Sequence, residues 1–152
     1  MTIQKINSFA IIGIAVKTSN QNGQSGIDIP ALWNKFMAEA VLEKIPNKID
    51  NTLYCMYTDY EKDHTQPYTT ILGCRVKNLD SIPDGMTGKL VKSGNYIKHT
   101  AKGNLLQGIV FDEWIKIWNL TIERSYTADF EVYGEKAQNP ENAEVDIFIA
   151  VK

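Results

Sequence analysis

The chain has 152 residues, of which 43% are hydrophobic and 22% are charged, and its formal net charge is −2. This length fits a single domain over residues 1–152, which buries enough surface to fold without disulfides or a metal. The mild acidity argues against direct nucleic-acid binding, which needs a basic surface that displaces counterions from phosphates. No run reaches the roughly 20 apolar residues of a membrane helix, so no membrane partner is expected. Two cysteines, Cys55 and Cys74, indicate a reduced cytoplasmic protein rather than a secreted disulfide framework.

The first half of the chain is predicted to form a strand, a helix and a hairpin of two strands. In chain order these are a strand over 3–17, a helix from Asp28 to Pro46, and strands over 52–60 and 68–77. Asp28 is expected to cap the helix, with Pro30 in its first turn. Apolar residues follow at helical spacing, and β-branched and aromatic residues fill the two later segments.

The second half repeats this order. The predicted elements are a strand over 87–100 that is interrupted at Ser93-Gly94, a helix that begins after Asn104, and strands over 128–133 and 144–151. Asn104 is expected to cap its helix, because Gln107 stands in the capping-box position. In the last strand the apolar residues alternate, as a strand with one buried face requires. The chain therefore contains β-α-β-β twice, in pseudo-repeats over about 1–80 and 81–152.

This element order predicts an α+β fold in which a duplicated β-α-β-β unit forms one antiparallel sheet. Each half has an amphipathic helix and an antiparallel strand set, and these must bury each other's apolar faces. Two helices should therefore pack on the sheet, with a central cleft between the halves. Binding sites favour such concave junctions.

Several strings in the sequence resemble a known family. They are, in chain order, Leu32-Trp33-Asn34-Lys35-Phe36, Ile45-Pro46-Asn47, Tyr57-Thr58-Asp59-Tyr60-Glu61, Tyr68-Thr69, Leu72-Gly73, Ile82-Pro83-Asp84-Gly85-Met86, Gly94-Asn95-Tyr96, Trp114-x-x-Ile117-Trp118 and Tyr126-Thr127-Ala128-Asp129-Phe130-Glu131-Val132-Tyr133. Together they resemble the GyrI-like family, and within it the AraC-type effector-binding domains, which include stand-alone integron-cassette proteins of bacteria.

The resemblance implies two strand-helix-strand-strand modules around a cleft that binds small molecules. In multidrug regulators of this family the cleft binds lipophilic organic cations by means of aromatic walls and one buried glutamate. By motif, that glutamate corresponds to Glu131 here. Family regulators usually carry a helix-turn-helix in the same chain, whereas this sequence shows no basic recognition helix. It is expected to be a sensor without its own DNA-binding domain.

Strand alternation places Glu131, Asp129 and Tyr133 on one face of the predicted strand 128–133. From the residues alone, Glu131 is either solvated on an outer face or held in the cleft, and the resemblance favours the cleft. A buried carboxylate loses hydration, which a ligand cation at close range can offset. Aromatic faces nearby would add cation–π attraction.

Six aromatic residues are candidates for the walls of the cleft. They are Trp33, Tyr57, Tyr68, Tyr96, Trp114 and Phe148. Both tryptophans lie on apolar helix faces, where a core position is the alternative. Tyr54 and Tyr57 have opposite strand parity, so at most one of them should face the cleft, and Tyr57 is taken as the candidate.

No metal, cofactor or catalytic site is expected. The two histidines, His64 and His99, are isolated from other metal-ligand residues, and His64 is placed in a solvated turn. No nucleophile motif or phosphate-binding loop is present, so an enzyme is the less favoured interpretation. Two alternatives stay open. One is hydrolysis of reactive small molecules by Glu131 with Tyr68 or Tyr96. The other is a gyrase-inhibitor-like module that binds a protein partner in trans.

Overall fold

A computed structural model describes residues 2–152. The elements, in chain order, are β1 (Ile3–Ile6), β2 (Phe9–Thr18), α1 (Ser25–Ala38), α2 (Val41–Lys44), β3 (Leu53–Thr58), β4 (Tyr68–Val76), β5 (Thr87–Val91), β6 (Gly94–Gly103), α3 (Ile109–Trp118), β7 (Ala128–Tyr133) and β8 (Ala143–Val151). Short 3₁₀ turns occupy Gln21–Gly23, Leu105–Gln107, Glu135–Ala137 and Pro140–Asn142. No helix in residues 2–152 is long and apolar enough to cross a membrane.

All the strands join one antiparallel sheet in the order β1-β6-β8-β7-β3-β4-β2-β5. The strands β1, β2, β3 and β4 of the first half correspond to β5, β6, β7 and β8 of the second. Exchanging every strand with its counterpart gives the same order, read from the opposite edge of the sheet. The sheet therefore has a pseudo-two-fold axis between β3 and β7. The first strand of each half pairs with the other half, β1 with β6 and β5 with β2. The predicted α+β fold with one antiparallel sheet and two main helices is confirmed.

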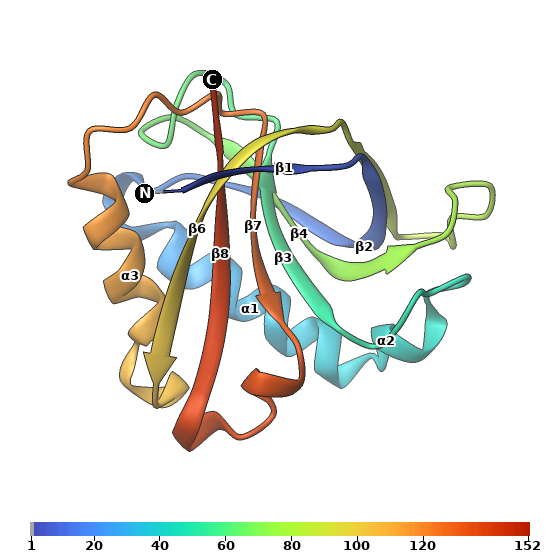
Figure 1. Ribbon diagram of the computed structural model, residues 1–152. Coiled ribbons are helices and arrows are strands. Elements are labelled where there is room, and N and C mark those ends of the chain that lie inside the picture. Colours follow the sequence, from blue (N-terminus) through green and yellow to red (C-terminus); the bar gives the residue numbers. More distant parts are fainter. Residues whose placement is uncertain (1) are drawn as a thin grey trace.

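The two main helices cover one face of the sheet, which we call the helix face. Figure 1 shows α1 and α3 on the same side, over opposite halves of the sheet. Beneath α1, Leu32 and Phe36 pack on β2 and β4. Beneath α3, Trp114 and Ile117 pack on β8. The helix face is therefore filled under each helix, and the strip over β3 and β7 lies between them.

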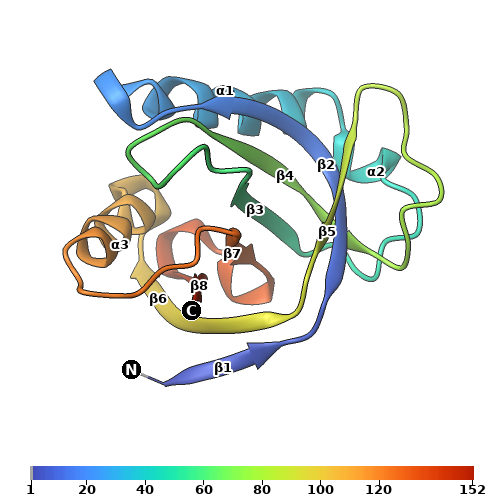
Figure 2. The ribbon, with the colours of Figure 1, turned by 90° about the horizontal axis from the view of Figure 1, so that it is seen from above.

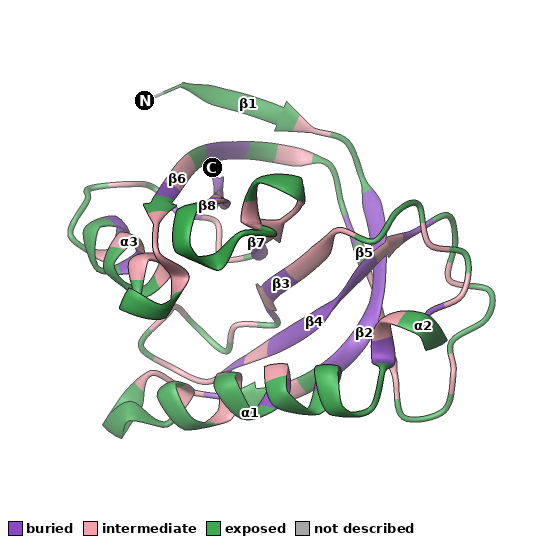
Figure 3. Cartoon of the chain, turned by 90° about the horizontal axis from the view of Figure 1, so that it is seen from below, coloured by how far each residue is buried: buried purple, intermediate pink, exposed green. Residues whose placement is uncertain are grey.

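The other face of the sheet curls around a second core, which we call the barrel face. Seen from above, the outer strands bend away from the helices into a half-barrel (Figure 2). Phe9, Tyr96 and Phe130 are buried inside this curl. Figure 3 shows the result: β2 and β4 are largely buried, and α1 carries its exposed residues away from the sheet.

Three predicted boundaries were wrong. The segment 3–17 is two strands, and β1 crosses to the second half of the sheet. Helix α1 begins at Ser25, so Asp28 is not its cap and Pro30 lies inside the helix. The helix stops at Ala38, because Ala40 adopts the left-handed conformation (φ 50°) and turns the chain into α2.

Asn104 caps a different element from the one predicted. Its side chain accepts a hydrogen bond from the Leu106 backbone N–H (2.9 Å), which closes the 3₁₀ turn. Gly108 then takes a left-handed φ of 72° and redirects the chain before α3 begins at Ile109. Such a conformation favours glycine, which has no Cβ to clash.

Candidate functional site

The site is built around Glu131, which lies near the centre of the sheet on the helix face. Alternation in β7 sends Asp129, Glu131 and Tyr133 to this face, as predicted, and Phe130 to the barrel face. Across the ladder, Glu131 pairs with Cys55 of β3. The side chain is only 2% exposed. A carboxylate so deep in the fold must be satisfied by other groups of the protein.

Three side chains donate hydrogen bonds to the Glu131 carboxylate. The Tyr57 hydroxyl and the Trp114 indole N–H both reach Oε2 at 2.7 Å, and the Tyr133 hydroxyl reaches Oε1 at 2.6 Å. Burial raises the pKa of Glu131, and the three donors only partly oppose this shift. Burial, reinforced by neighbouring negative charge, also holds the pKa of Tyr57 and Tyr133 well above the ordinary value, so both remain donors.

A cavity of about 80 Å³ lies on one side of this cluster, between the start of α1 and the end of α3. We call it the small cavity. Its aromatic lining comes from the β3–β4 hairpin and from α3, and consists of Tyr57, Tyr60, Tyr68, Phe111, Trp114 and Trp118. The Tyr57 ring stands edge-on to both Tyr68 (5.9 Å between centroids) and Trp114 (5.5 Å). Glu131 does not line the small cavity: Tyr57 and Trp114 stand between its carboxylate and the space.

A larger hollow of about 940 Å³ lies on the other side, between the end of α1 and the start of α3. We call it the open groove. Trp33 and Tyr133 line it, with their ring centroids 4.8 Å apart. Glu131 therefore sits between two concavities, with Tyr57 and Trp114 facing one and Tyr133 facing the other.

A second buried carboxylate, Asp129, lies beside the small cavity and is paired. It is 0% exposed, and its Oδ2 accepts from the Arg124 guanidinium (2.7 Å) and from the Tyr60 hydroxyl (2.6 Å). Its Oδ1 accepts from the Ala150 backbone N–H at 2.8 Å. Burial and the Asp129 charge raise the pKa of Tyr60 well above its ordinary value. Asp129 and Arg124 thus form a neutral pair.

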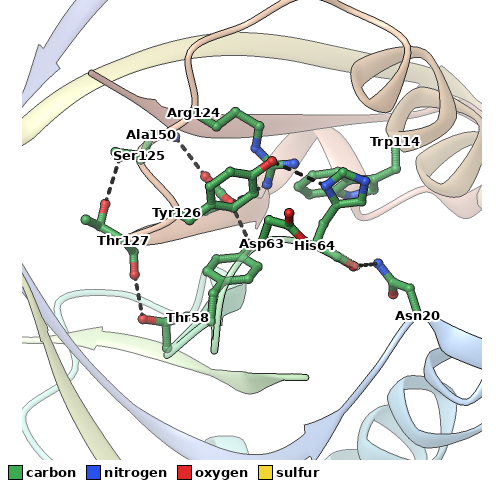
Figure 4. Close-up of polar contacts among 12 residues, drawn as sticks. Asn20, Thr58, Asp63, His64, Trp114, Arg124, Ser125, Tyr126, Thr127 and Ala150 are labelled. Atoms are coloured by element: carbon green, nitrogen blue, oxygen red, sulfur yellow. Dashed lines mark hydrogen bonds and ion pairs between the residues drawn. The ribbon is translucent and has the colours of Figure 1, made fainter. Parts of the chain in front are cut away.

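The loop between β3 and β4 closes the small cavity. The His64 ring stacks on Trp118 (5.7 Å) and on Tyr126 (6.3 Å), and its Nδ1 lies 3.3 Å from the Tyr126 hydroxyl. On the opposite side Asn20 donates to the His64 carbonyl oxygen at 2.9 Å. Figure 4 shows this ring beside Arg124 and Trp114. His64 does lie in a turn, as predicted, but it is half-buried rather than solvated, because three other segments of the chain contact it.

The structure brings most of the predicted site residues together. On the helix face, Tyr57 and Trp114 contact Glu131 directly, Tyr68 lines the small cavity, and Trp33 lines the open groove. Tyr68 is anchored by donating to the Asn20 side chain at 2.5 Å. These aromatic side chains flank one charged group.

Tyr96 and Phe148 do not join the cluster, because both lie on the barrel face. Tyr96 is 2% exposed and packs against Phe130 at 5.5 Å between ring centroids. Phe148 is the ladder partner of Phe130 and stacks on it at 5.0 Å. On β8 the helix face belongs instead to Ile147 and Ile149.

Several residues of the site were not among the predicted ones. Tyr133 and Asp129 share strand parity with Glu131, so alternation already placed them on the same face. Tyr60, His64 and Arg124 lie outside regular elements, where no periodic pattern indicates direction. Their placement depends on the tertiary fold.

Comparisons with known proteins agree with this fold. The model of the Cass2 family, described as integron-associated effector binding protein, matches residues 2–151. A putative transcriptional regulator protein of Bacillus subtilis (strain 168), YobU, is 28% identical over 129 residues, covering 82% of this chain and 79% of its own.

Two solved structures share the fold over nearly the whole chain. The integron cassette protein VCH_CASS2 of Vibrio cholerae is 32% identical, with a TM-score of 0.78 over 99% of this chain and 95% of its own. The protein SAV2435, solved bound to tetraphenylphosphonium, is 17% identical, with a TM-score of 0.78 over 99% of this chain and 93% of its own. With a family model that spans residues 2–151 and this fold, the chain belongs to the Cass2 family of integron-associated effector-binding proteins.

Proposed function

We propose that this protein binds lipophilic organic cations between α1 and α3, with Glu131 as the source of negative charge. The observation that carries the proposal is the buried Glu131 carboxylate beneath the aromatic walls of Tyr57 and Trp114. SAV2435, which has the same fold, was solved with such a cation bound. The relation to sensor domains of regulators fits the same role.

The physics favours a monovalent cation. Asp129 and Arg124 cancel each other, so an ionised Glu131 leaves the site with one net negative charge. In a buried site this charge acts at low effective dielectric, even across the ring that separates it from the ligand. Each aromatic face adds about 0.5–2 kcal/mol of cation–π attraction.

The ligand in this proposal occupies the small cavity. The cavity has about 80 Å³, whereas pockets for drug-sized ligands have roughly 300–1,000 Å³, so the site must widen on binding. The β3–β4 loop closes the cavity mainly through the side-chain contacts of His64, Asn20 and Gln21. These contacts are the ones that a bound ligand would displace.

The test is calorimetric titration of tetraphenylphosphonium into the wild type, Glu131→Gln and Glu135→Gln. Glu135 lines the open groove and is exposed, so it is a matched control that also removes one carboxylate. Loss of a buried charge opposite the cation should weaken binding by about tenfold or more in Glu131→Gln, and Glu135→Gln should bind like the wild type. Absence of saturable binding, or equal affinity in all three proteins, would contradict the proposal.

Hydrolysis ranks second. A carboxyl group with a raised pKa, bonded to tyrosine hydroxyls beside a cavity, is a general acid–base arrangement. However, Tyr57, Trp114 and Tyr133 all donate to the Glu131 carboxylate, and this carboxylate does not line the small cavity, where a substrate would bind. Turnover of an electrophilic substrate that disappears in Glu131→Gln would reverse this order. Binding to a protein partner in trans has no specific contact in its favour.

A further inference from the structure

The guanidinium of Arg124 is only partly used by the fold. Its side chain is 5% exposed, lines the small cavity and lies over the rings of Tyr126 (4.3 Å to the centroid) and Trp114 (5.9 Å). Nη2 binds Asp129, but Nε and Nη1 find no hydrogen-bond partner anywhere in residues 2–152. Buried N–H groups without partners are costly and rare, and an arginine carries five donors in a fixed plane.

We propose that Arg124 forms a second recognition point in the small cavity, where it donates to an uncharged oxygen acceptor on the bound molecule. The ligand is then an organic cation that also carries a carbonyl or a similar oxygen. The inference rests on the proposed function for the cationic part of the ligand. It adds the requirement for an acceptor, which Glu131 and the aromatic walls do not impose.

The geometry makes Arg124 a fixed donor. Asp129 holds one edge of the guanidinium, and the rings of Tyr126 and Trp114 lie along its faces (Figure 4). The unpartnered nitrogens are therefore held in position before a ligand arrives, so little ordering is needed on binding. Two hydroxyl groups that line the cavity are already engaged, because Tyr60 donates to Asp129 and Tyr68 donates to Asn20.

The charges around Arg124 select an uncharged acceptor over an anion. Asp129 already neutralises the guanidinium, and Glu131 adds a further negative charge behind Trp114. A ligand carboxylate would lie close to both and be repelled at low dielectric. A carbonyl oxygen accepts from the guanidinium without this repulsion.

The test uses three triphenylphosphonium ions that differ only in the fourth substituent: pentyl, 4-oxopentyl and 4-carboxybutyl. Each is titrated into the wild type and into Arg124→Lys. Lysine keeps the charge opposite Asp129 but has one nitrogen, which that carboxylate occupies. The ratio of the Kd of the pentyl ion to the Kd of the 4-oxopentyl ion should be about tenfold greater in the wild type than in Arg124→Lys, because the ketone oxygen accepts a hydrogen bond from a charged donor. The 4-carboxybutyl ion should bind the wild type more weakly than the ketone.

The outcomes separate this inference from the proposed function. If the pentyl ion binds but the ketone has the same relative affinity in both proteins, the acceptor point is wrong and cation binding stands. If the carboxylate binds most tightly, the uncharged acceptor is wrong. If none of the three binds, both proposals fail.

A second measurement covers the case in which Arg124→Lys does not fold. The chain has two arginines, Arg75 and Arg124, so Arg75→Lys identifies the Nε–H resonance of Arg124 in the nitrogen-15 spectrum. The ketone ion should move this resonance downfield, and the pentyl ion should not produce the same shift. Identical spectra with both ions would mean that the ketone oxygen does not contact Arg124, and would overturn the inference.

Discussion

The two halves of the sheet place different chemistry at equivalent positions. The pseudo-two-fold axis passes through the ladder pair of Cys55 and Glu131. Two residues later in each strand stand Tyr57 and Tyr133, and both donate to the same carboxylate. Each tyrosine also packs edge-on against the tryptophan of the other half's helix, Tyr57 on Trp114 and Tyr133 on Trp33. The strands and the tyrosine–tryptophan pairs are therefore symmetric about this axis, whereas the carboxylate beside the axis comes from the second half alone.

The difference continues toward the ends of the strands. Two residues before Glu131 stands Asp129, paired with Arg124 beside the small cavity, whereas two residues before Cys55 stands Leu53, which lines the open groove. The pseudo-symmetric sheet thus carries two unlike concavities, and only the small cavity has a buried ion pair and an enclosed aromatic lining. A symmetric scaffold can carry an asymmetric site when a few central positions diverge.

The largest effect should come from breaking the ion pair that only the second half contains. Arg124→Met leaves the buried Asp129 without a charged partner, which should cost about 3–5 kcal/mol of unfolding free energy. The double variant Arg124→Met/Asp129→Leu copies the leucine of the first half and should recover much of this loss. Urea denaturation measures both. Arg75→Met, which breaks no ion pair, should lose far less, and equal losses in the two single variants would contradict the assignment.

Exchanging the two tyrosines for leucine tests which concavity binds the cation. Tyr57→Leu and Tyr133→Leu each remove one ring and one hydrogen bond to Glu131, so their unfolding free energies should fall by similar amounts. Only Tyr57 lines the small cavity, and loss of its ring should weaken tetraphenylphosphonium binding by about 3- to 30-fold. Tryptophan fluorescence titration measures the affinity. A larger loss of affinity in Tyr133→Leu would indicate that the ligand binds in the open groove.

The smallest expected effect is a dependence of stability on pH. It arises from Glu131 and not from Cys55, the neutral residue at the equivalent position of the first half. Burial lifts the folded-state pKa of Glu131 above its ordinary 4.5, so the folded chain holds this proton more tightly than the unfolded chain. This contribution to stability is complete below pH 4.5 and is lost as the pH rises through the folded-state pKa. The other groups that face Glu131, namely Cys55, Tyr57 and Tyr133, have raised pKa values and stay neutral there.

Glu131→Gln should therefore gain stability relative to the wild type as the pH rises from 4.5 through the folded-state pKa of Glu131. Over the same range the wild type should bind tetraphenylphosphonium more tightly as Glu131 ionises, and Glu131→Gln should show no such rise. Parallel urea and binding titrations across this range measure the two trends. A wild-type affinity that does not change with pH would mean that Glu131 is fully ionised or takes no part.

The strand periods and the family resemblance together were enough to predict the fold and the position of Glu131. Alternation in β7 placed the glutamate on the correct face, and the helical spacing of Trp114 placed it above the sheet. The same reasoning failed for Phe148, because β8 contributes side chains to a core on each face of the sheet and its minority parity leads to the core of the barrel face. Residues such as His64 and Arg124 lie in loops, where direction follows from contacts between distant segments.

The crossing of β1 and β5 has a consequence for how the molecule can be divided. Each repeat gives its first strand to the other repeat, so neither repeat contains the whole of its own edge. A cut in the connection near residue 80 would yield two fragments that each expose an unpaired strand edge and cannot complete a sheet alone. The fragments would be obligate complements, reassembling only as a pair, which is the behaviour of a split protein rather than of two linked domains.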